Sequence, residues 1–186
     1  MTNNPCRLLC IDLQADAIPG CEPDPAAMAA ARNLISAGRR LGWTIAHTRR
    51  RTLPVIRARN GSQAPSVNPL MSEQVFFHDG RSVAEAYGLS GLLRSWREET
   101  VLVAAFDPVA LLSCVLACQE PGPRLLLVED VMPMRTLESA ARVGIFHGED
   151  LRGAFRGTTL AKLVKDAGRA TGVHVLPLPE GQRPGL

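Results

Sequence analysis

Lysine is nearly absent from this chain, and several features that would define a broad functional class are missing as well. Only two of the 21 basic residues are lysines, Lys162 and Lys165, so the first 161 residues contain none. No apolar run approaches the roughly 20 residues that a bilayer-spanning helix needs. The first five residues lack the basic start and the cleavage site of a signal peptide. We therefore expect a cytoplasmic protein with no membrane partner.

The cysteines, histidines and glycines form none of the common cofactor motifs. Five cysteines at positions 6, 10, 21, 114 and 118 contain no CxxC pair, and the four histidines are dispersed along the chain. No GxGxxG or GxxxxGK motif occurs. Aromatic residues make up only 4% of the chain, and none interleaves with its arginine cluster, which argues against nucleic-acid binding. The sequence thus predicts no metal, no cofactor and no nucleic-acid partner.

Apolar runs that alternate with helical patterns indicate the fold class. The chain has 186 residues, of which 46% are hydrophobic, and we expect one domain over 1–177 with a loose tail at 178–186. The predicted strands are 7–12, 43–48, 101–105, 125–130, 154–157 and 173–176, and 50–72 is expected to be a loop. The predicted helices are 25–41, 82–98, 108–120, one from about 137, and 159–168. Near-continuous apolar strands separated by helices predict an α/β three-layer sandwich, with a mostly parallel sheet and helices on both faces.

The first strand closes on a carboxylate, Asp12, and a Pro19-Gly20 turn follows. Open α/β folds bind ligands at the carboxyl edge of the sheet, where this side chain is expected. With Gln14 and Asp16, the segment resembles the D-x-Q-x-D-F-x-x-P-G opening of isochorismatase-like cysteine hydrolases. Ala17 replaces the aromatic residue of that pattern. The resemblance spans about residues 5–170 and implies that Asp12 is the acid/base that moves protons for a cysteine nucleophile.

A second segment, from Glu73 to Val83, resembles the family pattern E-x-V-I-x-K-x-x-x-S-A-F, with His78 in the lysine position. A histidine can hold a proton and pair with Asp12, but near neutral pH it is only partly charged. A histidine that is merely hydrogen-bonded at a loop–helix junction is the alternative interpretation. Arg81, three residues on, could supply the permanent positive charge instead.

The family nucleophile lies in a pattern like G-V-x-T-x-x-C-V, in the first turn of the helix after the third predicted strand, where the helix N-terminus favours a thiolate. Counting from the strand end places Leu111 in the cysteine position. The resemblance makes Phe106 and Asp107, which precede the helix, candidate substrate-binding residues. A rival alignment takes Cys114-Val115-Leu116-Ala117-Cys118 as the family's C-V-L-A-T. It needs three extra residues before the helix and places Cys114 about 4–5 Å further along the axis. Both positions remain candidates.

An arginine cluster, Arg49-Arg50-Arg51 with Arg57 and Arg59, follows the strand predicted at 43–48. The cluster is either part of a solvated loop or an anion-binding rim for a carboxylate substrate or an acidic partner. Together with Gln14 and Arg81, Arg49 is therefore a candidate substrate-binding residue.

The resemblance and its departures together predict a divergent hydrolase-like protein with impaired or lost cysteine chemistry. Such a protein would bind a small carboxylate or amide ligand, or act as a non-catalytic partner. One alternative is an active amidohydrolase that uses Cys114 with Asp12 and His78. The other is cysteine-free hydrolysis of the isochorismatase type through Asp12. A homo-oligomer is expected as well, because relatives associate and the helix predicted at 82–98 carries Tyr87 and Trp96.

Overall fold

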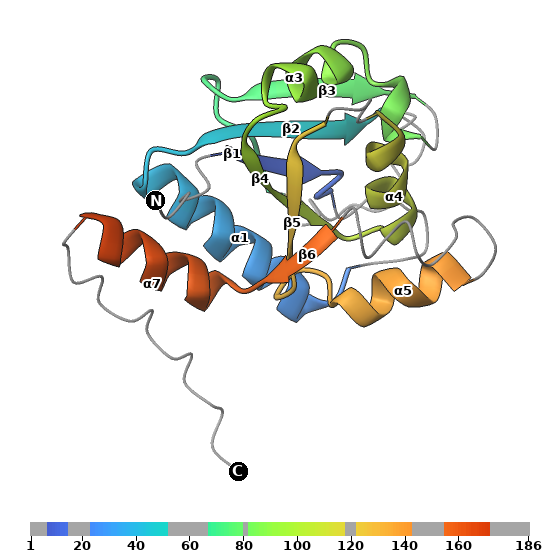
Figure 1. Cartoon of the computed structure of the whole chain (residues 1–186). Coiled ribbons are helices and arrows are strands. Elements are labelled where there is room, and N and C mark those ends of the chain that lie inside the picture. The colour runs from blue at the N-terminus through green and yellow to red at the C-terminus, as the bar shows by residue number, and fades with distance from the viewer. Residues whose placement is uncertain are drawn as a thin grey trace, which may run out of the picture.

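Six parallel strands form one sheet in the order β3-β2-β1-β4-β5-β6 (Figure 1). The computed structural model describes residues 7–14, 23–51, 67–79, 82–117, 122–142 and 155–171. The strands are β1 (Arg7–Ile11), β2 (Thr44–Arg50), β3 (Gln74–His78), β4 (Thr100–Ala105), β5 (Arg124–Val128) and β6 (Phe155–Thr158). The apolar strand β1 lies at the centre, as a strand buried on both faces must. The predicted parallel sheet is confirmed.

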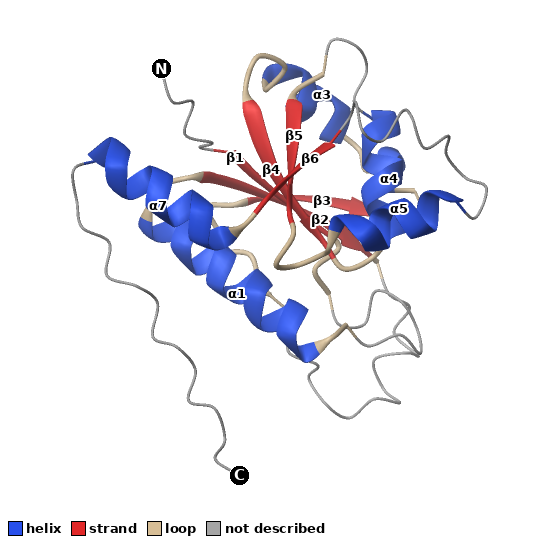
Figure 2. Cartoon of the chain, turned by 60° about the horizontal axis from the view of Figure 1, so that its bottom comes forward, coloured by secondary structure: helices blue, strands red, loops and turns tan. Residues whose placement is uncertain are grey.

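Helices cover both faces of the sheet, which confirms the predicted three-layer sandwich (Figure 2). On one face lie α1 (Pro25–Arg40) and α7 (Leu160–Thr171). On the other face lie α3 (Leu89–Ser95), α4 (Pro108–Ala117) and α5 (Met134–Arg142). A short 3₁₀ turn, η1 (Val83–Glu85), joins β3 to α3. Within the described ranges, no helix combines the length and the apolar character that a membrane crossing requires.

The structure differs from the predicted elements in three places. The short edge strand β3 was not predicted, because two of its five residues, Gln74 and Phe77, face solvent. The helix predicted over 82–98 is split, since Gly88 adopts a left-handed φ of 86° and α3 begins only after it. The helix predicted from about 137 begins at Met134. The strand predicted at 173–176 and the tail at 178–186 lie outside the described residues, and the single-domain organisation stays a prediction.

Helix α1 forms where the sequence predicts it. The side chain of Asp24 caps the helix by accepting a hydrogen bond from the backbone N–H of Ala26, and Pro25 occupies the first helical position. Its buried stripe of Met28, Ala31, Leu34 and Ile35 packs on the face of the sheet that carries Leu8 and Cys10. The amphipathic pattern therefore determines which side of the sheet α1 covers.

Gly38 allows α1 to approach Trp43, which leads to a stability prediction. A Cβ at Gly38 would lie 2.8 Å from Cε3 of the buried Trp43 ring. Gly38→Ala should lower the free energy of unfolding by about 1–2 kcal/mol, because the overpacking outweighs the gain in helix propensity. Urea denaturation followed by circular dichroism measures the change. Gly91→Ala is the matched control, since a Cβ there meets nothing within 4 Å in α3. Equal effects at the two positions would contradict the packing argument.

Candidate active site

Asp12 lies between the two neighbouring strands, β1 and β4, from which the strand order runs outward in opposite directions. It directly follows β1, while Phe106 and Asp107 directly follow the neighbouring strand β4, and Ile11 is in register with Ala105. From β1 the chain continues outward through α1 to β2, and from β4 it continues through α4 in the opposite direction. The carboxyl ends of two such strands flank the crevice in which open α/β folds bind ligands. Asp12 therefore lies at the position in the sheet where open α/β folds bind their ligands.

The backbone at Asp12 turns sharply away from β1. Its φ of 47° lies in the left-handed region, which Asp adopts more readily than most residues. Its N–H contacts the backbone oxygen of Thr48 at 3.3 Å and the Thr48 hydroxyl at 3.1 Å. Asp12 is buried, with only 4% of the residue exposed. Strand β2 therefore holds both the turn and the carboxylate that it carries.

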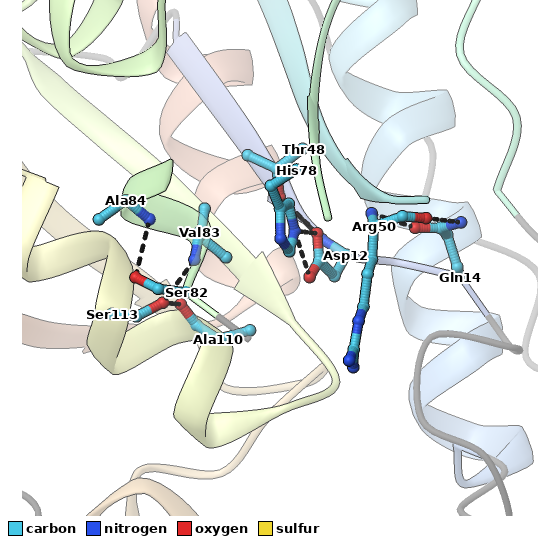
Figure 3. Close-up of polar contacts among 10 residues, drawn as sticks. All are labelled: Asp12, Gln14, Thr48, Arg50, His78, Ser82, Val83, Ala84, Ala110 and Ser113. Carbon is cyan, nitrogen blue, oxygen red and sulfur yellow. Dashed lines mark hydrogen bonds and ion pairs between the residues drawn. The ribbon is translucent and has the colours of Figure 1, made fainter. Parts of the chain in front are cut away.

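The carboxylate of Asp12 faces the imidazole of His78 (Figure 3). The His78 Nε2 atom lies 3.0 Å from Oδ1 and 2.9 Å from Oδ2, and the Thr48 hydroxyl donates to Oδ1 at 2.7 Å. An ionised carboxylate can only accept hydrogen bonds, so it pairs with the form of His78 that carries a hydrogen on Nε2. All three residues are buried. The structure thus brings Asp12 and His78 together, with His78 at the end of β3.

Helix α4 begins at Pro108, where the sequence predicts it. The Asp107 carboxylate accepts a hydrogen bond from the N–H of Val109 at 2.8 Å and so caps the helix. Leu111, in the first turn, bonds through its N–H to the Asp107 carbonyl. Leu111 and Cys114 are both fully buried in the same core cluster as Ile11, on the face that α4 covers. Both candidate nucleophile positions therefore face the sheet, and Cys114 lies one turn deeper.

A buried serine joins α4 to the segment that follows His78. The Ser113 hydroxyl accepts a hydrogen bond from the N–H of Val83 in η1 and donates one to the Ala110 carbonyl, each at 2.9 Å (Figure 3). These two hydrogen bonds hold η1 against α4. They thereby help to fix the position of the segment after β3 relative to the first turn of the helix. Sequence reasoning singled out neither Ser113 nor Thr48, because a lone hydroxyl in a helix or strand carries no signal of its partner.

The remaining predicted binding residues have different surroundings. Gln14 exchanges two hydrogen bonds with the backbone of Arg50, at 2.8 and 3.2 Å, which extends the contact between β1 and β2 beyond the strand ends. Arg49 turns toward another segment and donates to the carbonyl of Val67 and the side chain of Asn68. Phe106 is partly buried against the core on the α1 face. Asp16, Arg57, Arg59 and Arg81 lie outside the described residues.

A second ionic cluster anchors the beginning of β3. Glu73 binds Arg39 through both carboxylate oxygens at 2.8 and 2.9 Å, and His47 contacts it at 2.9 Å. Burial alone would raise the pKa of Glu73, but hydrogen bonds from Arg39, from the backbone of Leu70 and from His47 outweigh burial and lower this pKa to about 2. Burial lowers the pKa of His47. Glu73 is therefore ionised across the ordinary pH range and holds β3 against α1 and β2.

This cluster predicts an acid-sensitive stability. A carboxylate whose folded-state pKa is depressed stabilises the fold above its ordinary pKa of 4.5, and this contribution is lost as pH falls toward about 2. Glu73→Gln should lower the free energy of unfolding at pH 7 by about 1–3 kcal/mol and flatten its decline between pH 5 and pH 2. Urea unfolding at several pH values measures both effects. The exposed Glu85→Gln serves as control, and an identical acid profile in both variants would contradict the assignment.

The described residues contain no group of three side chains suited to hold a metal ion. No protein-family model matches the sequence, and the curated proteins provide no match either. Solved structures do match. A putative hydrolase of the isochorismatase family from Chromobacterium violaceum is 22% identical with a TM-score of 0.64, over 91% of this chain and 96% of that one.

Two further solved structures have the same architecture. An isochorismatase from Pseudomonas putida is 20% identical with a TM-score of 0.61, covering 84% of this chain and 88% of that one. An isochorismatase-like hydrolase from Alkaliphilus metalliredigens is 13% identical with a TM-score of 0.62, covering 89% and 98%. The chain therefore has the fold of isochorismatase-family hydrolases, as the resemblance around Asp12 and His78 implied.

Proposed function

We propose that this chain is a divergent isochorismatase-type protein whose cysteine chemistry is impaired or lost and whose site binds a small carboxylate or amide ligand. The observation that carries the proposal is the buried Asp12–His78 pair, with Nε2 at 2.9 and 3.0 Å from the carboxylate oxygens. The resemblance would place a lysine where His78 stands, and it would place a thiol where Leu111 stands.

The chemistry of these side chains favours binding over hydrolysis. A carboxylate and an imidazole in contact can pass a proton between them and hydrogen-bond an amide or carboxyl group. Covalent amide hydrolysis also needs a nucleophile, which the aliphatic side chain of Leu111 cannot supply. A ligand-binding role, or a role as a non-catalytic partner of another protein, does not require a nucleophile.

Two alternative functions would depend on different residues of the same site. An active amidohydrolase would use Cys114, whose thiol is fully buried one helical turn beyond Leu111. Cysteine-free hydrolysis would need Asp12 to deliver a proton to the substrate without the lysine of the family pattern. Variants of Cys114 and Asp12 distinguish these functions, because the first requires the Cys114 thiol and the second requires only the Asp12 carboxylate.

The test is a thermal-shift and hydrolysis screen of small carboxylates and amides. A ligand at about 100 times its Kd should stabilise the native protein by about 2.7 kcal/mol, and Asp12→Asn should abolish this stabilisation. No turnover is expected in native protein, Cys114→Ser or Asp12→Asn. Amide hydrolysis that Cys114→Ser removes would replace the proposal with an active cysteine amidohydrolase. Hydrolysis that survives in Cys114→Ser but not in Asp12→Asn would establish the cysteine-free route.

We also propose that a second copy of the chain packs at the β3 edge of the sheet. Four of the five large hydrophobic side chains that are exposed in the described residues belong to β3 or its flanks, namely Leu70, Met71, Phe77 and Tyr87. Tyr87 is 96% exposed, whereas Trp96 is buried in the core and contributes nothing to this surface. An exposed edge strand with apolar flanks is a natural site of association. Light scattering at micromolar concentration should give a dimer or larger species, and a monomer would contradict this.

A further inference from the structure

A groove of about 450 Å³ lies between α1 and the segment that precedes β3. Its helical wall carries Arg32, Ser36, Arg39 and Arg40, and its other wall is formed by Val67 and Asn68. Three guanidinium groups therefore line the groove, and its lining includes no carboxylate. A concave surface of one charge concentrates the electrostatic potential and attracts ions of opposite sign.

Two of these arginines have no acidic partner among the described residues. Arg39 is bound by Glu73, but Arg32 and Arg40 are exposed, and no ion pair involves either of them in the part of the chain that the structure describes. Arg39 and Arg40 belong to the last turn of α1, where cations also complement the helix dipole. Arg32 lies two turns earlier, so the dipole does not account for its position.

The spacing along α1 directs the groups to one side. Arg32, Ser36 and Arg39 follow the i, i+4, i+7 pattern that places side chains on a single face of a helix. By helix rise, Arg32 and Arg40 are roughly 12 Å apart along the axis. Flexible arginine side chains at this spacing can converge on one multivalent anion from both ends.

The opposite wall is itself held by arginines. The Arg39 Nη2 atom donates to the Asn68 carbonyl at 3.0 Å, and the Arg49 Nη2 atom donates to the Val67 carbonyl at 3.1 Å and the Asn68 side chain at 3.2 Å. The segment is thus fastened to both α1 and β2. Among the described residues, four guanidinium groups and the carboxylate of Glu73 meet in this region, so the net charge around the groove is positive.

We propose that this groove binds a small multivalent oxyanion bearing phosphate or carboxylate groups. Guanidinium groups match the geometry of both oxyanions through paired N–H donors. The site is separate from Asp12, because α1 leads away from the carboxyl edge of the sheet and Arg39 and Arg40 lie at its far end. A neighbouring cavity of about 620 Å³ fits the role less well, since its Arg39 and Glu73 neutralise each other.

Titration calorimetry at low ionic strength tests this proposal with two probes, pyrophosphate and citrate. The native protein should bind at least one of them, and the preferred probe distinguishes phosphate from carboxylate recognition. Arg32→Gln/Arg40→Gln should weaken binding at least tenfold. The control Arg124→Gln/Arg135→Gln removes the same charge from two exposed arginines on β5 and α5, and it should change Kd less than twofold.

Three results would overturn the proposal. The first is no binding of either probe at millimolar concentration, and the second is equal weakening in the two double variants, which would indicate only net charge. The third is loss of binding in Asp12→Asn, which would place the anion at the Asp12 site instead. Binding that Asp12→Asn leaves intact supports the groove even if the proposed ligand function of the Asp12–His78 pair fails. Thermal melts of the double variants verify that both remain folded.

Discussion

Leu111→Cys is expected to create a thiol that iodoacetamide alkylates roughly tenfold to hundredfold faster at pH 7 than Cys114 of the same folded protein. Residue 111 lies in the first turn of α4, closer than Cys114 to the helix N-terminus, where the helix dipole favours a thiolate. Its side chain faces the sheet with Ile11, the residue directly before Asp12. Peptide mass spectrometry of timed reactions measures the rate at each cysteine.

Two further variants give this experiment its controls. Leu112→Cys replaces another fully buried leucine of the same helix and should react no faster than Cys114 of the folded protein. Adding Asp12→Asn to Leu111→Cys should slow alkylation, because the carboxylate would no longer take up the thiol proton. An inert thiol at 111 beside a reactive Cys114 would show that Cys114 occupies the nucleophile position.

His78→Ala is expected to lower the free energy of unfolding by about 3–5 kcal/mol. The loss is large because the substitution leaves the Asp12 carboxylate buried without the imidazole that contacts both of its oxygens. Urea denaturation at pH 7 measures the change.

A double-mutant cycle measures the interaction energy between Asp12 and His78 separately from the effect of each single substitution. Asp12→Asn is the conservative partner, since asparagine tolerates the left-handed φ at this position. The double variant Asp12→Asn/His78→Ala should lose clearly less than the sum of the single losses, because the neutral amide has no uncompensated charge. Additive losses would show that Asp12 and His78 do not stabilise each other.

The central sheet could be predicted because its strands are nearly continuous apolar runs. Asp12 could be predicted with them, since a polar residue that closes a buried strand falls at the carboxyl edge. Strand β3 could not be predicted, because two of its five residues face solvent and its pattern resembles a loop. His78 was identified only through the spacing from Glu73 to Ser82, which the resemblance supplied.

The features of the site that could not be predicted depend on contacts between segments that are distant in the sequence. Thr48 binds Asp12 across 36 residues, and nothing in strand β2 marks its hydroxyl as a partner. The orientation of the Arg49 side chain depends on its hydrogen bonds to Val67 and Asn68, which lie 18 and 19 residues further along the sequence. The choice between Leu111 and Cys114 stays open from sequence because both residues lie on one face of the same helix.

Alkylation of the native protein at Cys114 tests the loss of thiol chemistry most directly. Intact protein is treated with iodoacetamide at pH 7, and the rate at Cys114 is compared with its rate in urea. We predict labelling at least about a hundredfold slower in the folded protein, because the thiol is fully buried and reacts only after local opening. Labelling faster than in urea, with parallel loss of an amidase activity, would contradict the account.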